Sequence, residues 1–117
     1  MTRATVALIT DATRRTFPGE RCAGRTSWTF NATRKDMAGY FDDAAAIAYV
    51  DECRVLITPL EKFSDVCRIA AHEVGHLGGR VHIDDPNNLM YEGAFGDAIV
   101  PACVRAERIW RRNGGGR

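Results

Sequence analysis

The chain has 117 residues, 45% of them hydrophobic and 26% charged, which is typical of one globular domain and excludes a disordered or fibrous protein. Its net charge of +1 gives no general reason to expect nucleic-acid binding. No apolar run approaches the roughly 18 residues that cross a membrane, and residues 1–10 lack the long apolar core and cleavage site of a secretory signal. We therefore expect a monomer without membrane contact that is cytoplasmic or released by other means.

The first half of the chain predicts two strands and a short helix. Residues 4–10 are apolar and rich in β-branched side chains, which predicts a strand buried on both faces of a sheet. An alternative is that residues 2–16 form a helix and that this first strand is absent. Residues 26–30 alternate around two aromatic side chains and predict the next strand. A short helix is expected within residues 33–43, where apolar side chains recur at helical spacing.

The second half predicts two more strands and two longer helices. The strands are residues 47–50 and 54–57. A long helix begins near Ser64 or slightly earlier, and its apolar side chains recur at i, i+3 and i+4 and face the sheet. They are Val66, Ile69, Ala70, Val74 and Leu77. The last helix is expected to run from Asp97, as its N-cap, to about Arg112. Its predicted apolar face consists of Ile99, Val100, Cys103, Val104 and Trp110.

The four cysteines have no C-x-x-C spacing, which disfavours a structural zinc site. An even number allows two disulfides, with three possible connectivities. Because Cys53 lies on a strand just before the helix that holds Cys67, a Cys53–Cys67 bond is geometrically reasonable. Free, buried cysteines are the alternative.

All three histidines of the chain lie around the end of the long helix. His72 and His76 are four residues apart, so their imidazoles point the same way, as two ligands of one metal ion would. Glu73 flanks the same face and could hold a carboxylate over a metal-bound water without ligating the metal. Gly79 ends the helix, because glycine tolerates the left-handed conformation of a sharp turn. The returning chain then supplies His82 as a third ligand and leaves a fourth position open for water.

This pattern, H-E-x-x-H-x-x-G-x-x-H, resembles the zinc-binding signature of the metzincin metallopeptidases. The stretch Asn88-Leu89-Met90-Tyr91 follows His82 and resembles the methionine turn of that clan, most closely in its matrixin branch. The resemblance covers about residues 46–92. It implies an α+β, zincin-like fold in which a small twisted mixed sheet packs on the zinc-binding helix, followed by the methionine turn and a C-terminal helix. It also implies one catalytic domain over residues 1–117. Its upper subdomain would end near residue 79, its lower one would span about 80–112, and a disordered tail would follow.

The residues and the resemblance together predict a zinc-dependent endopeptidase. One Zn²⁺ ion held by His72, His76 and His82 would lower the pKa of a bound water from about 15.7 toward 7. Glu73 would act as the general base for this water and then donate the proton to the leaving amine of a protein or peptide substrate. Gly79 supports the metal site by forming the sharp turn after the helix. The resemblance implies that Met90 supports the metal site by packing beneath the zinc.

Two other interpretations stay open. One is a catalytically inactive, zinc-stabilised binding or interaction domain with the same fold, which the small size and short amino-terminal half motivate. Glu73 argues against it, because a structural site has no use for a carboxylate beside an open coordination position. The other is a different metal, such as iron or cobalt, although three imidazoles in near-tetrahedral geometry suit zinc. The chain also departs from the family: Glu92 stands where some metzincins have a tyrosine, and no cysteine-bearing propeptide is expected to mask the zinc.

Overall fold

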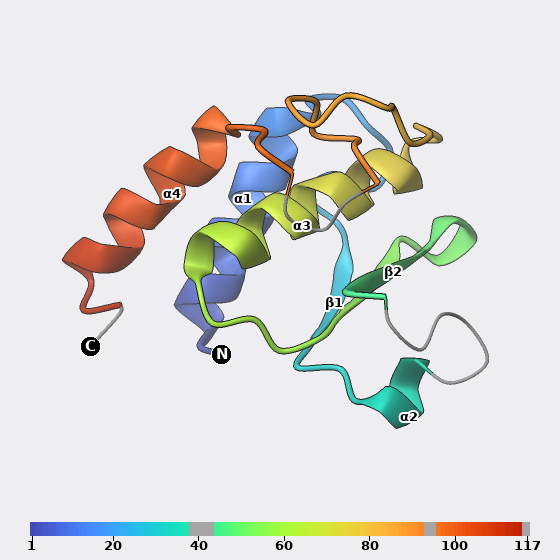
Figure 1. The fold of residues 1–117 in the computed structure, drawn as a ribbon. Coiled ribbons are helices and arrows are strands. Elements are labelled where there is room, and N and C mark those ends of the chain that lie inside the picture. The colour runs from blue at the N-terminus through green and yellow to red at the C-terminus, as the bar shows by residue number, and fades with distance from the viewer. Residues whose placement is uncertain (38–43, 93–95, 116–117) are drawn as a thin grey trace.

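The computed structural model describes residues 1–37, 44–92 and 96–115. This part of the chain forms a small α+β domain with a three-stranded mixed sheet and four helices (Figure 1), which confirms the predicted class. The elements follow in the order α1 (Arg3–Thr16), β1 (Ser27–Phe30), α2 (Arg34–Met37), β2 (Ala46–Tyr49), the 3-10 turn η1 (Val50–Glu52), β3 (Arg54–Ile57), α3 (Phe63–Leu77) and α4 (Pro101–Arg112). Among the described residues, no helix is long and apolar enough to cross a membrane.

The sheet has the order β1-β3-β2, with β1 parallel and β2 antiparallel to the central strand β3. Val55 and Ile57 of β3 belong to the main core with α3, whereas Leu56 points to the opposite face and packs with Met37 of α2. This alternation follows from the two-residue period of a strand. The three strands predicted within residues 26–57 are confirmed, except that Val50 belongs to η1. Of the helix predicted over 33–43, residues 34–37 form α2, and residues 38–43 lie outside the described residues.

α3 is the central layer of the domain. The sheet lies on one side of it, and α1 and α4 pack together on the other (Figure 1). The predicted apolar stripe is buried along its whole length. Burial of this stripe holds the histidine-bearing helix in place, because a helix packed from both sides has little freedom to shift.

The prediction of a strand over residues 4–10 is wrong, and the alternative of a helix over residues 2–16 is correct. The Thr2 side chain caps α1 by accepting a hydrogen bond from the Thr5 N–H, 3.1 Å away. One face of the helix then packs against α3 and α4 and buries Ile9, Ala12 and Thr13. β-branched residues lower helix propensity by less than about 0.7 kcal/mol each, and this packing outweighs that cost.

The prediction that α4 begins after an Asp97 N-cap is wrong. The N-cap is Val100, and Pro101 occupies the first turn, where its missing N–H and fixed φ are compatible with a helix start. Ile99 therefore lies outside the helix and is 81% exposed. The buried face of α4 consists of Cys103 and Ala106, with Trp110 stacked on Phe63 at 4.9 Å between ring centroids.

The predicted Cys53–Cys67 disulfide is wrong, and so is the alternative of free cysteines. Cys22 is bonded to Cys53 and Cys67 to Cys103, with Cα separations of 5.2 and 5.7 Å. The first bond follows from the sheet. β1 runs parallel to β3 and Ser27 pairs with Arg54, so the segments that precede these two strands meet. The second bond ties α3 to α4, an element whose position no local pattern indicates.

Candidate metal centre

Three histidine side chains converge at the carboxyl end of α3. His76 Nε2 lies 3.1 Å from His72 Nε2 and 3.0 Å from His82 Nε2. One ligand atom from each residue lies within 4.8 Å of the others. A tetrahedral zinc ion holds two imidazole nitrogens about 3.3 Å apart, because each Zn–N bond is about 2.0–2.1 Å long. The three residues that the spacing singled out therefore form a cluster that could hold a metal ion.

The second ring nitrogen of two of these histidines contacts a backbone carbonyl. His72 Nδ1 lies 2.7 Å from the Leu89 oxygen, and His76 Nδ1 lies 2.9 Å from the Arg80 oxygen. A carbonyl only accepts, so each Nδ1 donates a hydrogen, and in the neutral imidazole the Nε2 then keeps its lone pair. Lone pairs that face one another this closely repel unless a cation lies among them. Carbonyl partners of this kind also fix the ring orientation of metal-binding histidines.

α3 ends in a Schellman motif that turns the chain back toward the histidines. The Gly79 N–H donates to the His76 carbonyl at 2.9 Å, and the Arg80 N–H donates to the Gly75 carbonyl at 3.0 Å. Gly79 has a φ of +88°, and the space around its Cβ position is open, so its backbone conformation and not crowding calls for glycine. The helix ends here as the sequence predicted, and the turn brings His82 beside His76.

The loop that follows packs back against α3. Asn88 Oδ1 accepts from the Met90 N–H at 2.9 Å, and the Ile83 N–H donates to the Met90 carbonyl at 2.9 Å. Met90 is buried, and its sulfur would lie 2.5 Å from a Cβ atom at Gly75. The loop therefore rests directly on the α3 backbone next to His76. This contact holds Leu89 where its carbonyl meets His72.

Burial shifts the ionisation of two side chains at the centre. It lowers the pKa of His72 below the ordinary value of 6.5, and the neighbouring His76 and His82 lower it further, while the hydrogen bond to Leu89 opposes the shift. Neutral imidazole is the form that binds metal. Burial also raises the pKa of Glu73 to about 7, and only 7% of this residue is exposed. A divalent cation nearby would favour the ionised form of that carboxyl group.

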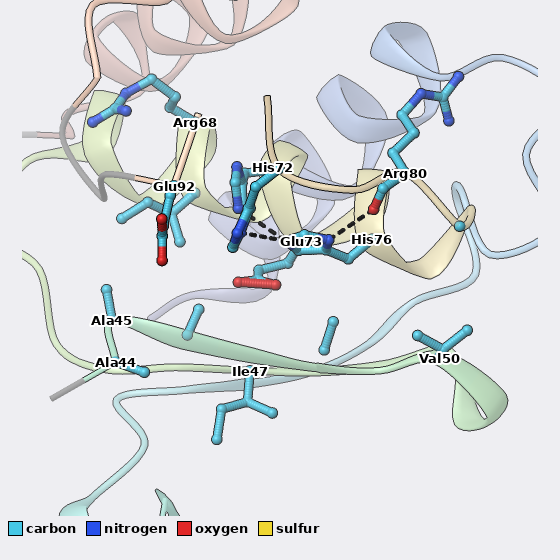
Figure 2. A pocket seen from close by; sticks show the side chains of 15 residues that line it. Ala44, Ala45, Ile47, Val50, Arg68, His72, Glu73, His76, Arg80 and Glu92 are labelled. Atoms are coloured by element: carbon cyan, nitrogen blue, oxygen red, sulfur yellow. Dashed lines mark hydrogen bonds between the residues drawn. The ribbon is translucent and has the colours of Figure 1, made fainter. Parts of the chain in front are cut away.

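The histidines and Glu73 line an open cleft of about 790 Å³ (Figure 2). α3 forms one wall, and residues 44–48 form the other. Consecutive residues of β2 line the cleft although their side chains alternate between faces, so the strand presents its edge to the cleft. β2 is an outer strand, and within the described ranges this edge has no partner strand. Arg68 and Glu92 line the same cleft.

Sequence reasoning missed the groups that orient the ligands. The carbonyls of Leu89 and Arg80 are backbone atoms, which leave no mark in the pattern of side chains. The loop before Met90 is ordered by Asp85 and Asn88, whose side-chain oxygens accept from the N–H groups of Asn87 and Met90, as turn residues commonly do. Phe17 and Glu20 contact Arg80 in the turn that ends α3, and no sequence pattern indicates this contact between distant parts of the chain.

Comparison of the chain with protein-family models, with curated proteins and with solved structures found no match.

Proposed function

We propose that this protein is a zinc-dependent endopeptidase of the metzincin type, acting on protein or peptide substrates. The observation that carries the proposal is that three imidazole Nε2 atoms and a buried carboxyl group share one open cleft. A structural zinc site is normally closed by four protein ligands. In the described part of the chain, the cluster found here has three histidines and no further ligand, which is the ligand number of a catalytic site.

The donor set suits zinc better than other common metals. Calcium and magnesium prefer oxygen ligands, and non-haem iron sites typically combine two histidines with a carboxylate. Here all three donors are imidazole nitrogens, and carbonyl partners hold two of them in the metal-binding tautomer. When bound, zinc supplies a Lewis acid that activates water and polarises a peptide carbonyl.

The edge of β2 is suited to bind the substrate in an extended conformation. An unpaired strand edge presents N–H and C=O groups that a peptide can pair with as an added strand. The wall formed by residues 44–48 contains four alanines, whose small side chains leave room beside the strand. A peptide paired with β2 would pass along the same cleft as the histidines and Glu73.

Glu73 moves the proton in the proposed reaction. Its carboxylate accepts a proton from the water that attacks the carbonyl carbon of the peptide. The resulting acid then donates this proton to the amine nitrogen as the C–N bond breaks, so the carboxylate is regenerated. Because Glu73 is next to His72 on a helix packed from both sides, its carboxyl group keeps a fixed position relative to the histidines.

The metzincin assignment is part of the same proposal. It is supported by the order of a metal-site helix, a glycine turn, a third histidine, a methionine-bearing loop and a C-terminal helix. The domain departs from the family expectation at its amino terminus, where α1 precedes the sheet without a first strand. We therefore propose a reduced form of the fold, in which α1 and α4 together cover α3.

The test combines metal content with peptide hydrolysis. Purified parent protein should contain about one equivalent of zinc and should cleave members of a broad peptide library. Glu73→Gln should keep the zinc and the fold but lose about 10²- to 10⁴-fold in kcat/KM, because general acid–base catalysis is withdrawn. The exposed Glu61→Gln variant, outside the cleft, controls for the loss of one negative charge and should cleave like the parent.

Each contrary result has a defined meaning. A parent that holds zinc but cleaves no peptide would favour the inactive, zinc-stabilised binding domain. A Glu73→Gln protein that cleaves as fast as the parent would show that another group is the base. If His82→Ala keeps full zinc affinity, the three-histidine site itself is wrong.

A further inference from the structure

Arg80 contacts the candidate metal centre through its backbone. Its N–H donates to the Gly75 carbonyl and completes the cap of α3, and its carbonyl accepts the hydrogen of His76 Nδ1. The position of this one residue therefore decides both where the helix ends and how the His76 ring is turned. It also decides where His82, two residues later, can reach.

The side chain of Arg80 is held by a segment 60 residues earlier in the chain. Its guanidinium group pairs with the Glu20 carboxylate and lies over the Phe17 ring, 4.4 Å from the ring centroid. Glu20 Oε2 would lie 2.5 Å from a Cβ atom at Gly78. The loop after α1 is thus in close contact with the turn that ends α3.

Phe17 lies between Arg80 and α3. Its ring edge would be 3.3 Å from a Cβ atom at Gly75, so the ring packs where α3 has no side chain. In a Schellman motif a hydrophobic residue after the turn commonly packs on the last helical turn. Here Arg80 and Gly75 occupy those two positions and cannot make that contact, and the Phe17 ring fills the space between them.

We propose that Phe17 and Glu20 are positioning residues of the metal centre, which act through Arg80. By holding its side chain, they keep the Arg80 carbonyl on His76 Nδ1 and hold the turn in the conformation that brings His82 to the metal. This inference rests on the proposed zinc site and concerns its affinity, not the hydrolytic step.

Backbone hydrogen bonds close the turn, but burial contributes little to its order, so a side-chain anchor adds to its stability. Residues 78–83 are all exposed, and Val81 is 73% exposed. The turn contains Gly78 and Gly79, and glycines lose the most conformational entropy when a chain becomes ordered. Prior ordering of the turn by Glu20 and Phe17 lowers the entropy lost when His82 joins a metal ion.

The experiment measures the zinc dissociation constant of the folded full-length protein by competition with a chromophoric chelator. Arg80→Ala should weaken binding about 10-fold, the lower end of the effect of losing a group that orients a metal ligand, because the carbonyl stays but loses the side-chain contacts that hold it in place. Glu20→Gln should weaken it by up to about fivefold, because an exposed ion pair contributes modestly. Arg80→Lys keeps the charge but not the planar group over Phe17, so its affinity should lie between those of the parent and Arg80→Ala.

The decisive comparison is a double-mutant cycle. If Glu20 acts through Arg80, Glu20→Gln should have no further effect in the Arg80→Ala background. Asp11→Asn provides the matched control, since it removes an exposed acid that pairs with arginines of α1 and should leave zinc affinity unchanged.

Three results would overturn the inference. They are an Arg80→Ala protein with parental zinc affinity, independent effects of the two substitutions, and an Asp11→Asn protein that loses as much affinity as Glu20→Gln. If Arg80→Ala does not fold, Phe17→Leu, which keeps an apolar side chain but removes the ring face under Arg80, takes its place in the cycle with Glu20→Gln. A parent that binds no zinc overturns the metal site together with this inference, whereas a parent that binds zinc without cleaving peptides leaves the inference standing.

Discussion

Glu73 combines a carboxyl group with surroundings that disfavour its charge. It is buried on α3, and burial raises its pKa from 4.5 to about 7. Above pH 7 the folded metal-free protein must keep a buried carboxylate, whereas the unfolded chain keeps the same charge in water. This residue therefore destabilises the metal-free protein at neutral and alkaline pH.

The metal-free Glu73→Gln protein should show the size of this effect. The destabilisation by Glu73 is absent below about pH 4.5, where the carboxyl group is protonated in both the folded and the unfolded protein. It is complete above pH 7, where the carboxyl group is ionised in both. A shift of about 2.5 pKa units corresponds to about 3 kcal/mol. The stability of Glu73→Gln relative to the parent should therefore rise by about that amount between pH 4.5 and pH 8, measured by urea unfolding with a chelator present.

The comparison with the parent removes the contribution of the histidines. His72 has a lowered pKa in the folded protein, so its contribution to stability is lost as the pH falls below 6.5, in both proteins alike. The exposed Glu61→Gln protein controls for the loss of a surface carboxylate. Parallel stability curves for the parent and Glu73→Gln would mean that Glu73 is not desolvated in the way the fold implies.

At the scale of elements, the sequence predicted best where one local pattern sufficed. α3 carries an unbroken apolar stripe and ends at Gly79, and β3 is a short apolar, β-branched run that is buried on both faces, so each can be identified from its own residues. α1 could not be decided in the same way. Its run of apolar and β-branched residues suits a buried strand, and only its packing against α3 and α4 makes it a helix.

In the candidate site, too, local features could be predicted from the sequence and tertiary contacts could not. His72, His76 and His82 converge because helical spacing and one glycine turn are local features. Their backbone partners Leu89 and Arg80 depend on how later loops return to α3. The disulfides also depend on tertiary arrangement, since the parallel pairing of β1 with β3 selects Cys22 as the partner of Cys53.

The contact between α3 and the loop that bears Met90 gives a prediction at this scale. Gly75→Ala should destabilise the protein by up to about 2 kcal/mol, because a new Cβ atom overlaps the Met90 sulfur. In a Met90→Ala background the overlap with the sulfur is gone and only the Phe17 ring, 3.3 Å from the new Cβ atom, still has to shift, so Gly75→Ala should destabilise the protein much less than in the parent. Urea unfolding of the four proteins measures both values. The same effect of Gly75→Ala in both backgrounds would show that the loop does not rest on Gly75.

At the scale of the whole molecule, the two disulfides join different pairs of layers. Cys67–Cys103 links α3 to α4 near the amino-terminal end of α3, away from the turn that carries Arg80. Cys22–Cys53 links the loop after α1 to the start of β3, and Cys22 is two residues from Glu20. Cys67–Cys103 therefore holds α3 and α4 together, and Cys22–Cys53 holds the segment that contacts the turn before His82.

Both bonds should contribute to stability by a similar amount. The bonded cysteines are 31 and 36 residues apart in the sequence. In the chain-entropy model, closing a loop of this size in the unfolded chain raises the free energy of unfolding by about 3–4 kcal/mol. Peptide mapping without reductant should recover Cys22 with Cys53 and Cys67 with Cys103. Replacing either pair by serine should lower the free energy of unfolding by roughly that amount. A map that pairs Cys53 with Cys67 would contradict the arrangement of β1, β3 and α4.

The two serine variants should differ in zinc affinity. Loss of Cys22–Cys53 frees the loop that carries Phe17 and Glu20, so Arg80 and the turn before His82 become less ordered and zinc should dissociate more easily. Loss of Cys67–Cys103 loosens α4 but leaves those contacts intact, so zinc affinity should stay near that of the parent wherever the protein is folded. Chelator competition at low temperature, where both variants remain folded, separates affinity from stability. Equal losses of affinity in the two variants would mean that zinc binding follows the stability of the whole domain and not the loop after α1.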